Sequence, residues 1–340
     1  MDIYDLTIVG GGPAGMYAAF YSGMRAMKTK LIEAKQELGG FMRMYPEKTI
    51  WDVGAVGPAR CEELIAVLEK QARTFHPTIV LEQEVHHLHR REDGVMVLTS
   101  GCGQQHLTRT VLLCAGRGII DRQKLELEGA NQYEVSNLYY TITDVGSFRG
   151  QHVLVSGGGN SAVDWANELH DHGAKVTVVH RREQFDALEY NIARMHEHAQ
   201  ILTPYTLHRL HGQQESIESV SLMNTVDGTI HRMAVDSVVV NHGYKRDYGP
   251  LLEWGLIQEN NGIRVNERMH TDVPGVFGAG DFVDYGSKVR LIAGAFNDAV
   301  LGVNSALHYL DPVASKQPSV SSHNVRFREL NRKLRERSRD

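Results

Sequence analysis

Residues 6–15 of the 340-residue chain read LTIVGGGPAG, an apolar run that leads into a glycine-rich turn. The run over residues 6–9 has the composition of a buried strand, and a helix-like segment follows the glycines. In this setting Gly10 permits the tight turn, Gly12 lets the backbone approach a pyrophosphate, and Gly15 lets the helix pack closely on the strand. Because the helix N-terminus then faces the phosphate charge, the segment predicts a dinucleotide site.

A second copy of this pattern, VLVSGGGNSA, occupies residues 153–162. Gly157, Gly159 and Ala162 repeat the spacing of the first copy, again between a strand-like run and a helix-like segment. One such motif is weak evidence, but two in one chain imply two dinucleotides and electron transfer between them. The chain is therefore predicted to be an α/β protein with two Rossmann-like dinucleotide-binding domains.

In each of the two motifs a second strand follows the helix, and the residues at the end of that strand indicate which nucleotide binds. Glu33 lies 18 residues after Gly15, near the spacing at which an acid accepts hydrogen bonds from a ribose. Arg181 and Arg182 stand at the corresponding strand end of the second copy, where a guanidinium can pair with the 2′-phosphate that a carboxylate would repel. The first site is thus predicted to take FAD and the second NADPH, although a solvent-exposed arginine pair is the alternative for the second.

A third signal is TDVPGVFGAGD, residues 271–281. Its small residues, Gly278 to Gly280, permit close approach to a cofactor, and Asp281 can accept hydrogen bonds from ribitol hydroxyls. Taken alone, the segment would also fit a β-hairpin that ends in an aspartate cap.

Bulk composition narrows the possible functions. The net charge of −5 gives no nucleic-acid signature, and no run of 18 apolar residues predicts a membrane span. The first strand is expected to begin at residue 3, which leaves no room for a signal peptide, so a cytoplasmic protein is expected. Cys61, Cys102 and Cys114 are far apart and form no CxxC pair, metal cluster or disulfide framework.

These segments, together with His180-Arg181-Arg182, resemble the thioredoxin-reductase-like flavoproteins over residues 1–311. Members with thioredoxin reductase activity carry a redox CxxC just before the second glycine motif, where this chain has Tyr140 and Thr143, which cannot form a disulfide. The YPEK segment at residues 45–48, Trp51-Asp52 and the C-terminal extension look instead like the bacterial ferredoxin/flavodoxin–NADP reductases of this type. That resemblance implies an FAD homodimer and an acidic carrier, ferredoxin or flavodoxin, as partner.

The resemblance also implies roles for particular residues. Tyr45 matches a tyrosine that stacks on one face of the isoalloxazine, although an ordinary half-buried loop tyrosine is the alternative, and His323 is the candidate to cover the other face. Gly294 matches the start of a helix that faces the flavin pyrimidine end. The FAD residues are expected to be Gly10, Gly12, Pro13, Ala14, Gly15, Glu33, Gly40, Tyr45, Asp281 and Gly294. The NADP residues are expected to be Gly157, Gly159, Asn160, Ser161, Ala162, Arg181 and Arg182.

Two features depart from the family pattern. Asp186 replaces an arginine, and an acid there weakens NADPH binding unless it points away or pairs with Arg181 or Arg182. Residues 325–340 hold seven Lys/Arg and three Asp/Glu. This composition favours a disordered, solvated tail, and the functional alternative is electrostatic steering of an acidic carrier.

The expected domains are an FAD-binding domain at residues 1–117 and 248–312, an inserted NADP-binding domain at 118–247, and a polar then basic extension at 313–340. The expected function is hydride transfer from NADPH to FAD, followed by single-electron transfer to ferredoxin or flavodoxin. Two alternatives share the same motifs: a reductase of small acceptors such as quinones or ferric chelates, and a non-catalytic flavin-binding redox module.

Overall fold

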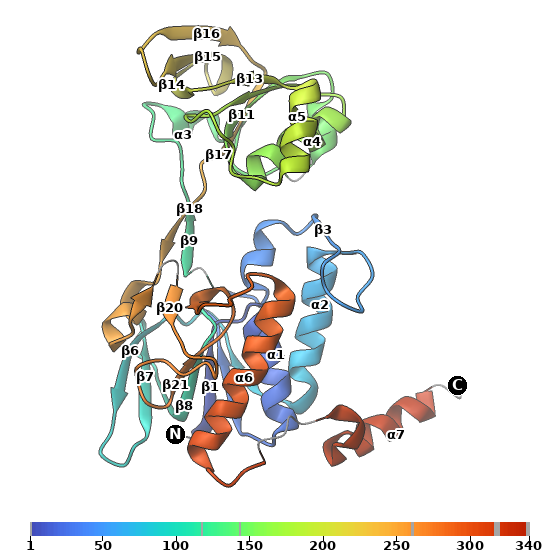
Figure 1. Cartoon of the computed structure of the whole chain (residues 1–340), viewed down its shortest axis with the longest axis vertical. Coiled ribbons are helices and arrows are strands. Elements are labelled where there is room, and N and C mark those ends of the chain that lie inside the picture. Colours follow the sequence, from blue (N-terminus) through green and yellow to red (C-terminus); the bar gives the residue numbers. More distant parts are fainter. Residues whose placement is uncertain (1, 117, 143, 260–261, 316–319, 338–340) are drawn as a thin grey trace. The chain divides into compact units, whose positions relative to one another are not determined.

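The computed structural model describes all of the chain except residues 1, 117, 143, 260–261, 316–319 and 338–340. The chain forms two compact units (Figure 1). Unit 1 contains residues 1–119 and 246–340, and unit 2 contains residues 120–245. The chain passes between them in β9 (Ile119–Arg122) and β18 (Tyr244–Asp247), which pair with each other.

Unit 1 is built on a seven-stranded sheet with β1 near its centre. Parallel pairing joins β1 to β2 and β8, β2 to β5, and β21 to the end of β8, whereas β6 and β7 are antiparallel. The carboxyl ends of β1, β2 and β8 therefore share one edge, where ligands bind in sheets of this type. The strands are β1 (Ile3–Val9), β2 (Thr29–Ile32), β5 (Thr78–Val80), β6 (Val85–Arg90), β7 (Met96–Ser100), β8 (Gln105–Leu113) and β21 (Val276–Gly278).

Helices α1 (Pro13–Met24), α2 (Cys61–Ala72) and α6 (Ile292–Leu310) pack against this sheet. Small side chains such as Ala18 and Ala299 line α1 and α6, which lets the two helices approach closely over buried Ile8. The smaller elements of unit 1 are β3 (Thr49–Ile50), β4 (Ala59–Arg60), β19 (Gln258–Glu259), β20 (Gly262–Arg264), β22 (Val283–Asp284), η1 (Gly40–Met44), η2 (Arg73–Phe75), η4 (Gly249–Trp254), η5 (Gly280–Phe282), η6 (Ser321–His323) and η7 (Val325–Phe327).

Unit 2 has a five-stranded parallel sheet in the order β10-β17-β11-β12-β13. Successive residues of β11 point to opposite faces: Val153 and Val155 pack against the helix α4, and Leu154 packs with the residues of a three-stranded antiparallel sheet. The large sheet of each unit carries the strand–turn–helix unit between parallel strands, so the predicted two-sheet α/β fold is confirmed. The elements are α3 (Ala130–Tyr133), β10 (Leu138–Tyr139), η3 (Val145–Phe148), β11 (His152–Gly157), α4 (Asn160–Asp171), β12 (Lys175–Val179), α5 (Glu189–His198), β13 (Gln200–Leu202), β14 (Tyr205–Gln213), β15 (Ser216–Asn224), β16 (Ile230–Ala234) and β17 (Ser237–Asn241).

From Ser321 onward the C-terminal extension is mostly helical. After η6 and η7, residues Arg328–Arg337 form α7. The disorder predicted for residues 325–340 is therefore wrong over residues 325–337, although most of the side chains there are exposed. The Phe327 ring packs 5.2 Å from the Phe75 ring and 6.2 Å from the Phe20 ring, and this apolar contact fixes the start of the helix. Among the described residues, no helix is both long and apolar enough to cross a membrane.

Candidate dinucleotide sites

The first glycine turn joins β1 to α1 in unit 1. Gly10 has φ +107°, and a Cβ atom there would lie 2.3 Å from the carbonyl oxygen of Cys114. A Cβ atom on Gly15 would lie 1.9 Å from the carbonyl oxygen of Gly10. Any side chain at either position would therefore open the turn, as the sequence predicts.

The N-terminal end of α1 is suited to an anion. Its N-cap is Gly12, Pro13 occupies the first turn, and that turn carries neither a side-chain cap nor an acidic residue. A Cβ atom built on Gly12 would have only the Cα atom of Gly40 within 4 Å, at 3.7 Å. The backbone at Gly12 is therefore open to the close approach of a ligand. The positive helix end can thus bind a pyrophosphate without displacing a protein carboxylate.

Glu33 lies beside this turn. Its side chain is 8% exposed, its Oε2 accepts a 2.6 Å hydrogen bond from the Gly11 amide, and its Oε1 accepts one of 2.9 Å from the Lys35 amide. Two backbone donors fix the carboxylate and leave it lone pairs for further donors. The structure thus gives the predicted ribose acceptor a fixed position at the turn.

Gly40 begins η1 directly against the turn, with φ +57° and a notional Cβ atom 2.8 Å from the Cα atom of Gly12. Tyr45 directly follows η1, and its half-buried ring lies 5.6 Å from the Phe41 ring in an edge-on arrangement. An amphipathic ring held in this way can present a face to a flat ligand.

The segment 271–281 returns to the same helix end. Gly280 has φ +77°, and a Cβ atom there would lie 3.0 Å from the Cβ atom of Ala14 on α1 and 3.8 Å from that of Ala295 on α6. The structure therefore brings the first glycine motif, half-buried Asp281 and the beginning of α6 together. Gly294 lies in the first turn of α6, where its Cβ would be 2.3 Å from the carbonyl oxygen of Val289.

A buried ionic cluster holds this segment, and sequence reasoning missed it. The Asp298 carboxylate is fully buried and forms an ion pair with Lys288, whose side chain is 2% exposed. It also accepts a 2.7 Å hydrogen bond from the Tyr285 hydroxyl and a 3.1 Å one from the Gly280 amide. Burial and the bond to Asp298 raise the pKa of Tyr285. The signal in the sequence was Asp298 itself: an aspartate within an apolar helix needs buried partners for its charge.

His323 does not lie near the first glycine turn of its own chain. It is exposed in η6, and the next residue, Asn324, donates from its side chain to the carbonyl oxygen of Met24 at 2.8 Å. Met24 is the last residue of α1, so His323 lies near the opposite end of that helix, about 18 Å along the axis from Gly12.

The second glycine turn joins β11 to α4 in unit 2. Gly157 has φ +155°, and its notional Cβ atom lies 2.5 Å from the carbonyl oxygen of Asn241. Gly159 caps α4 without any side-chain bond, and the first turn of α4 holds no acidic residue, so this helix end is also open to an anion. Ala162 is buried beneath the turn, and Ser161 beside it is half-buried.

The loop after β12 packs on this turn. The Asp186 amide donates to the Gly158 carbonyl oxygen at 2.7 Å, and the Leu188 amide donates to Asn160 Oδ1 at 3.1 Å. Arg181 and Arg182 are exposed on the same loop. The predicted NADP residues of unit 2 thus surround one sheet edge.

His180 belongs to a motif that the sequence analysis used, but the sequence assigned it no role of its own. Its ring is 7% exposed, stacks on Phe185 at 5.3 Å and occupies the place that a Gly158 side chain would fill. Burial, and then the charges of Arg182 and Arg181, lower its pKa. A neutral ring here leaves the two arginines as the cations of the loop.

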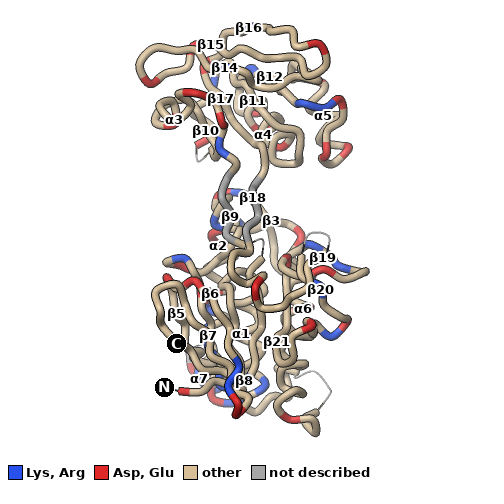
Figure 2. Tube along the Cα trace, turned by 90° about the vertical axis from the view of Figure 1, so that its left-hand side faces the viewer, with Lys and Arg blue, Asp and Glu red and all other residues tan. Residues whose placement is uncertain are grey.

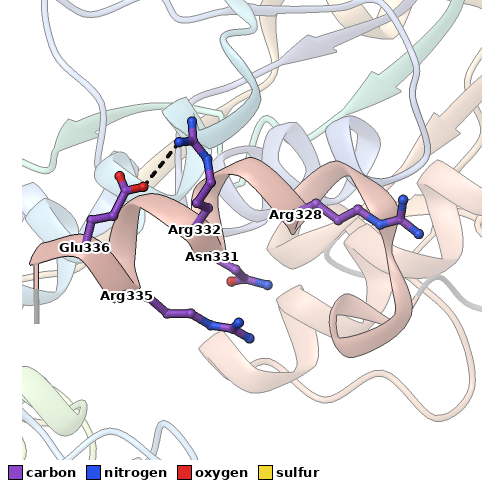
Figure 3. A pocket seen from close by; sticks show the side chains of 5 residues that line it. All are labelled: Arg328, Asn331, Arg332, Arg335 and Glu336. Atoms are coloured by element: carbon purple, nitrogen blue, oxygen red, sulfur yellow. Dashed lines mark hydrogen bonds and ion pairs between the residues drawn. The ribbon is translucent and has the colours of Figure 1, made fainter.

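α7 carries a basic face (Figure 3). A hollow of about 400 Å³ lies along the helix, and two of its lining residues, Arg332 and Glu336, form a hydrogen bond of 3.2 Å. Elsewhere basic and acidic residues lie side by side along both units (Figure 2). The hollow is lined by Arg328, Asn331, Arg332, Arg335 and Glu336.

The three cysteines, all in the described part of the chain, form no disulfide. Cys61 and Cys114 are buried, Cys102 is exposed, and all three are free thiols. The Tyr140 hydroxyl accepts a 3.0 Å hydrogen bond from the Leu125 amide, and Thr143 lies outside the described residues. In the part of the chain that the structure describes, no group of His, Cys, Asp or Glu could hold a metal ion.

Comparison with known proteins places the chain in a family. The family model for pyridine nucleotide-disulphide oxidoreductases matches residues 4–299. Proteins named ferredoxin–NADP reductase 1 from Bacillus pumilus and Shouchella clausii are 51% and 47% identical over 336 residues, which cover 98% of this chain and 97% of each relative. The crystal structure of Lactococcus lactis thioredoxin reductase is 25% identical, with a TM-score of 0.76 over 90% of this chain and 99% of that one.

Proposed function

Since the chain belongs to the pyridine nucleotide-disulphide oxidoreductase family, with ferredoxin–NADP reductases as relatives, we propose that it transfers electrons from NADPH to ferredoxin or flavodoxin with FAD as cofactor. The observation that carries this proposal is the convergence of the glycine turn, Glu33 and the Gly280–Asp281 segment at the N-terminal end of α1. FAD, when bound, supplies hydride acceptance from a nicotinamide and the release of single electrons.

We assign the FAD-binding roles to unit 1. The first turn of α1, including Pro13 and Ala14, binds the pyrophosphate, because its positive end is uncapped. Glu33 accepts from the adenosine ribose, and Asp281 accepts from the ribitol. Tyr45 stacks on the isoalloxazine, while His323 receives no role on the flavin of its own chain because of its place near the far end of α1.

We assign the NADPH-binding roles to unit 2. The uncapped start of α4 binds the pyrophosphate, and the exposed guanidinium groups of Arg181 and Arg182 pair with the 2′-phosphate. Buried His180 supports the glycine turn from below and stays neutral, because burial and the two arginines oppose its protonation. No acid–base residue is required, because these groups only bind and orient the nucleotide.

The proposal includes a cytoplasmic homodimer and an acidic electron carrier. The described part of α7 holds five Lys/Arg and two Asp/Glu in residues 328–337, and its basic face is exposed. Such a surface raises the encounter rate with an acidic protein and does so most at low salt. Light scattering of the purified protein tests the dimer.

NADPH-driven cytochrome c reduction by the FAD-loaded protein, with and without added ferredoxin, tests the function. Strong stimulation by ferredoxin is expected. If NADPH bleaches the flavin but ferredoxin gives no stimulation, the protein is a reductase of small acceptors such as quinones or ferric chelates. If neither NADPH nor NADH bleaches the flavin, it is a flavin-binding module without this activity.

A further inference from the structure

An acidic residue is fixed at the edge of the second glycine turn. Besides the hydrogen bond from its amide to Gly158, Asp186 pairs with Gly159 in an isolated parallel bridge. Two residues later, the bond from Leu188 to Asn160 holds the loop again. Asp186 therefore lies about one strand spacing, about 4.8 Å, from the turn that faces the predicted pyrophosphate.

The charge of Asp186 is not cancelled within the loop. Its side chain is exposed, and across the described chain it makes no ion pair with Arg181 or Arg182, although all three belong to the same nine-residue loop before α5. The loop thus carries two positive charges, Arg181 and Arg182, and two negative ones, Glu183 and Asp186, and only Asp186 is bonded through its backbone to the glycine turn. A carboxylate repels a 2′-phosphate but accepts a hydrogen bond from a ribose 2′-hydroxyl.

We propose that Asp186 is a specificity-determining residue that lets unit 2 take NADH as well as NADPH. This inference rests on the proposed function, since it concerns the same nucleotide site. The arginines attract the phosphorylated ribose, and Asp186 offsets that attraction while it offers an acceptor to the unphosphorylated one. For one charge that faces a doubly charged phosphate about 7 Å away in a water-like dielectric, Coulomb's law gives about a tenfold effect on binding.

Anaerobic stopped-flow reduction of the full-length, FAD-loaded protein by NADPH and by NADH tests the proposal. In Asp186→Asn, the ratio of second-order rate constants for NADPH over NADH is expected to rise about tenfold. The change should appear in the apparent affinity for NADPH and leave the limiting rate of flavin reduction in place. It should also shrink as salt is added, because exposed charges are screened.

Glu215→Gln is the matched control. Glu215 is another exposed acid of unit 2, and its carbonyl oxygen accepts a hydrogen bond from Ser136, which precedes the amino end of β10. It therefore lies at the sheet edge opposite the glycine turn. This variant makes the same charge change and is expected to leave the ratio unchanged.

Calorimetric binding of 2′,5′-ADP and of 5′-AMP provides a readout that needs no electron transfer. Asp186→Asn is expected to bind 2′,5′-ADP about tenfold more tightly, with no gain for 5′-AMP. If NADPH reduces the flavin but Asp186→Asn changes neither the ratio nor 2′,5′-ADP binding, the inference is wrong and the proposed function stands. If neither nucleotide reduces the flavin, the proposed function fails, and the calorimetry still decides the role of Asp186.

Discussion

The buried ion pair between Lys288 and Asp298 should be one of the most sensitive points of unit 1. Asp298→Asn keeps the shape of the side chain but removes its charge, so the Lys288 ammonium is left buried without a counter-ion. Breaking a buried pair from one side costs about 3–5 kcal/mol. This is a large share of the roughly 5–15 kcal/mol by which a domain is stable. The variant should also hold FAD less tightly, because the same carboxylate accepts from the Gly280 amide.

Urea denaturation of a double-mutant cycle measures this effect. Lys288→Met removes the other charge, and the double variant should be more stable than Asp298→Asn alone, because it buries no unpaired ion. Asp272→Asn is the control: its pair with Arg264 is also in unit 1, but the side chains are 36% and 48% exposed, so the loss should stay below about 1 kcal/mol. Equal losses in Asp298→Asn and Asp272→Asn, or strict additivity in the double variant, would refute the reasoning.

Four further predictions follow from particular contacts. Gly15→Ala should abolish flavin absorbance in the purified protein because the new methyl would meet the Gly10 carbonyl, whereas Gly54→Ala, with nothing within 4 Å, should keep it. Burial, together with the Lys30 ammonium, lowers the pKa of His106 from 6.5 to about 4. Between pH 6.5 and 4 the imidazole is protonated in the unfolded state but stays neutral in the folded state. The free energy of unfolding should therefore fall by roughly 3 kcal/mol over this range. Denaturation of His106→Gln at several pH values should lack this contribution. Cys102 is exposed and a hydrogen bond from a neighbouring serine lowers its pKa, so a thiol reagent should label it rapidly in the native protein and label the two buried cysteines only after unfolding. Neutralising the basic hollow of α7 should slow ferredoxin-dependent turnover and flatten its salt dependence while flavin reduction by NADPH is unchanged; equal salt slopes would argue against steering. The α7 residues to replace with glutamine are Arg328, Arg332 and Arg335.

The geometry of the two glycine turns could be predicted from the sequence because it depends on local constraints. Gly10 and Gly157 have backbone angles and contacts that exclude a side chain. A turn of this kind therefore requires glycine at these positions, and the glycine can be recognised in the sequence. Glu33 could be placed because the strand that precedes it must end at the same sheet edge as the turn. These relations join residues that are close in the sequence, so residue order and spacing were sufficient to predict them.

The extension shows where composition misleads. Its charge favoured a disordered tail, yet Phe327 packs against Phe20 and Phe75, which are far away in the sequence, and a helix follows. Likewise, nothing near His323 in the chain indicates that it lies close to Met24. Contacts with residues that are distant in the sequence decided both outcomes: ring packing for Phe327 and a hydrogen bond from Asn324 for the place of His323.

The sequence by itself determined the two strand–turn–helix units and the residue types proposed to select each nucleotide, since these follow from backbone sterics and charge at fixed spacings. Only the tertiary structure decided which distant segments complete each site. Gly280 reaches Ala14 because a buried Asp298 holds its amide, and Asp186 reaches the second turn through a backbone hydrogen bond. Such contacts depend on which separate elements meet. Apolar periodicity shows that an element packs, but it does not show against which other element it packs.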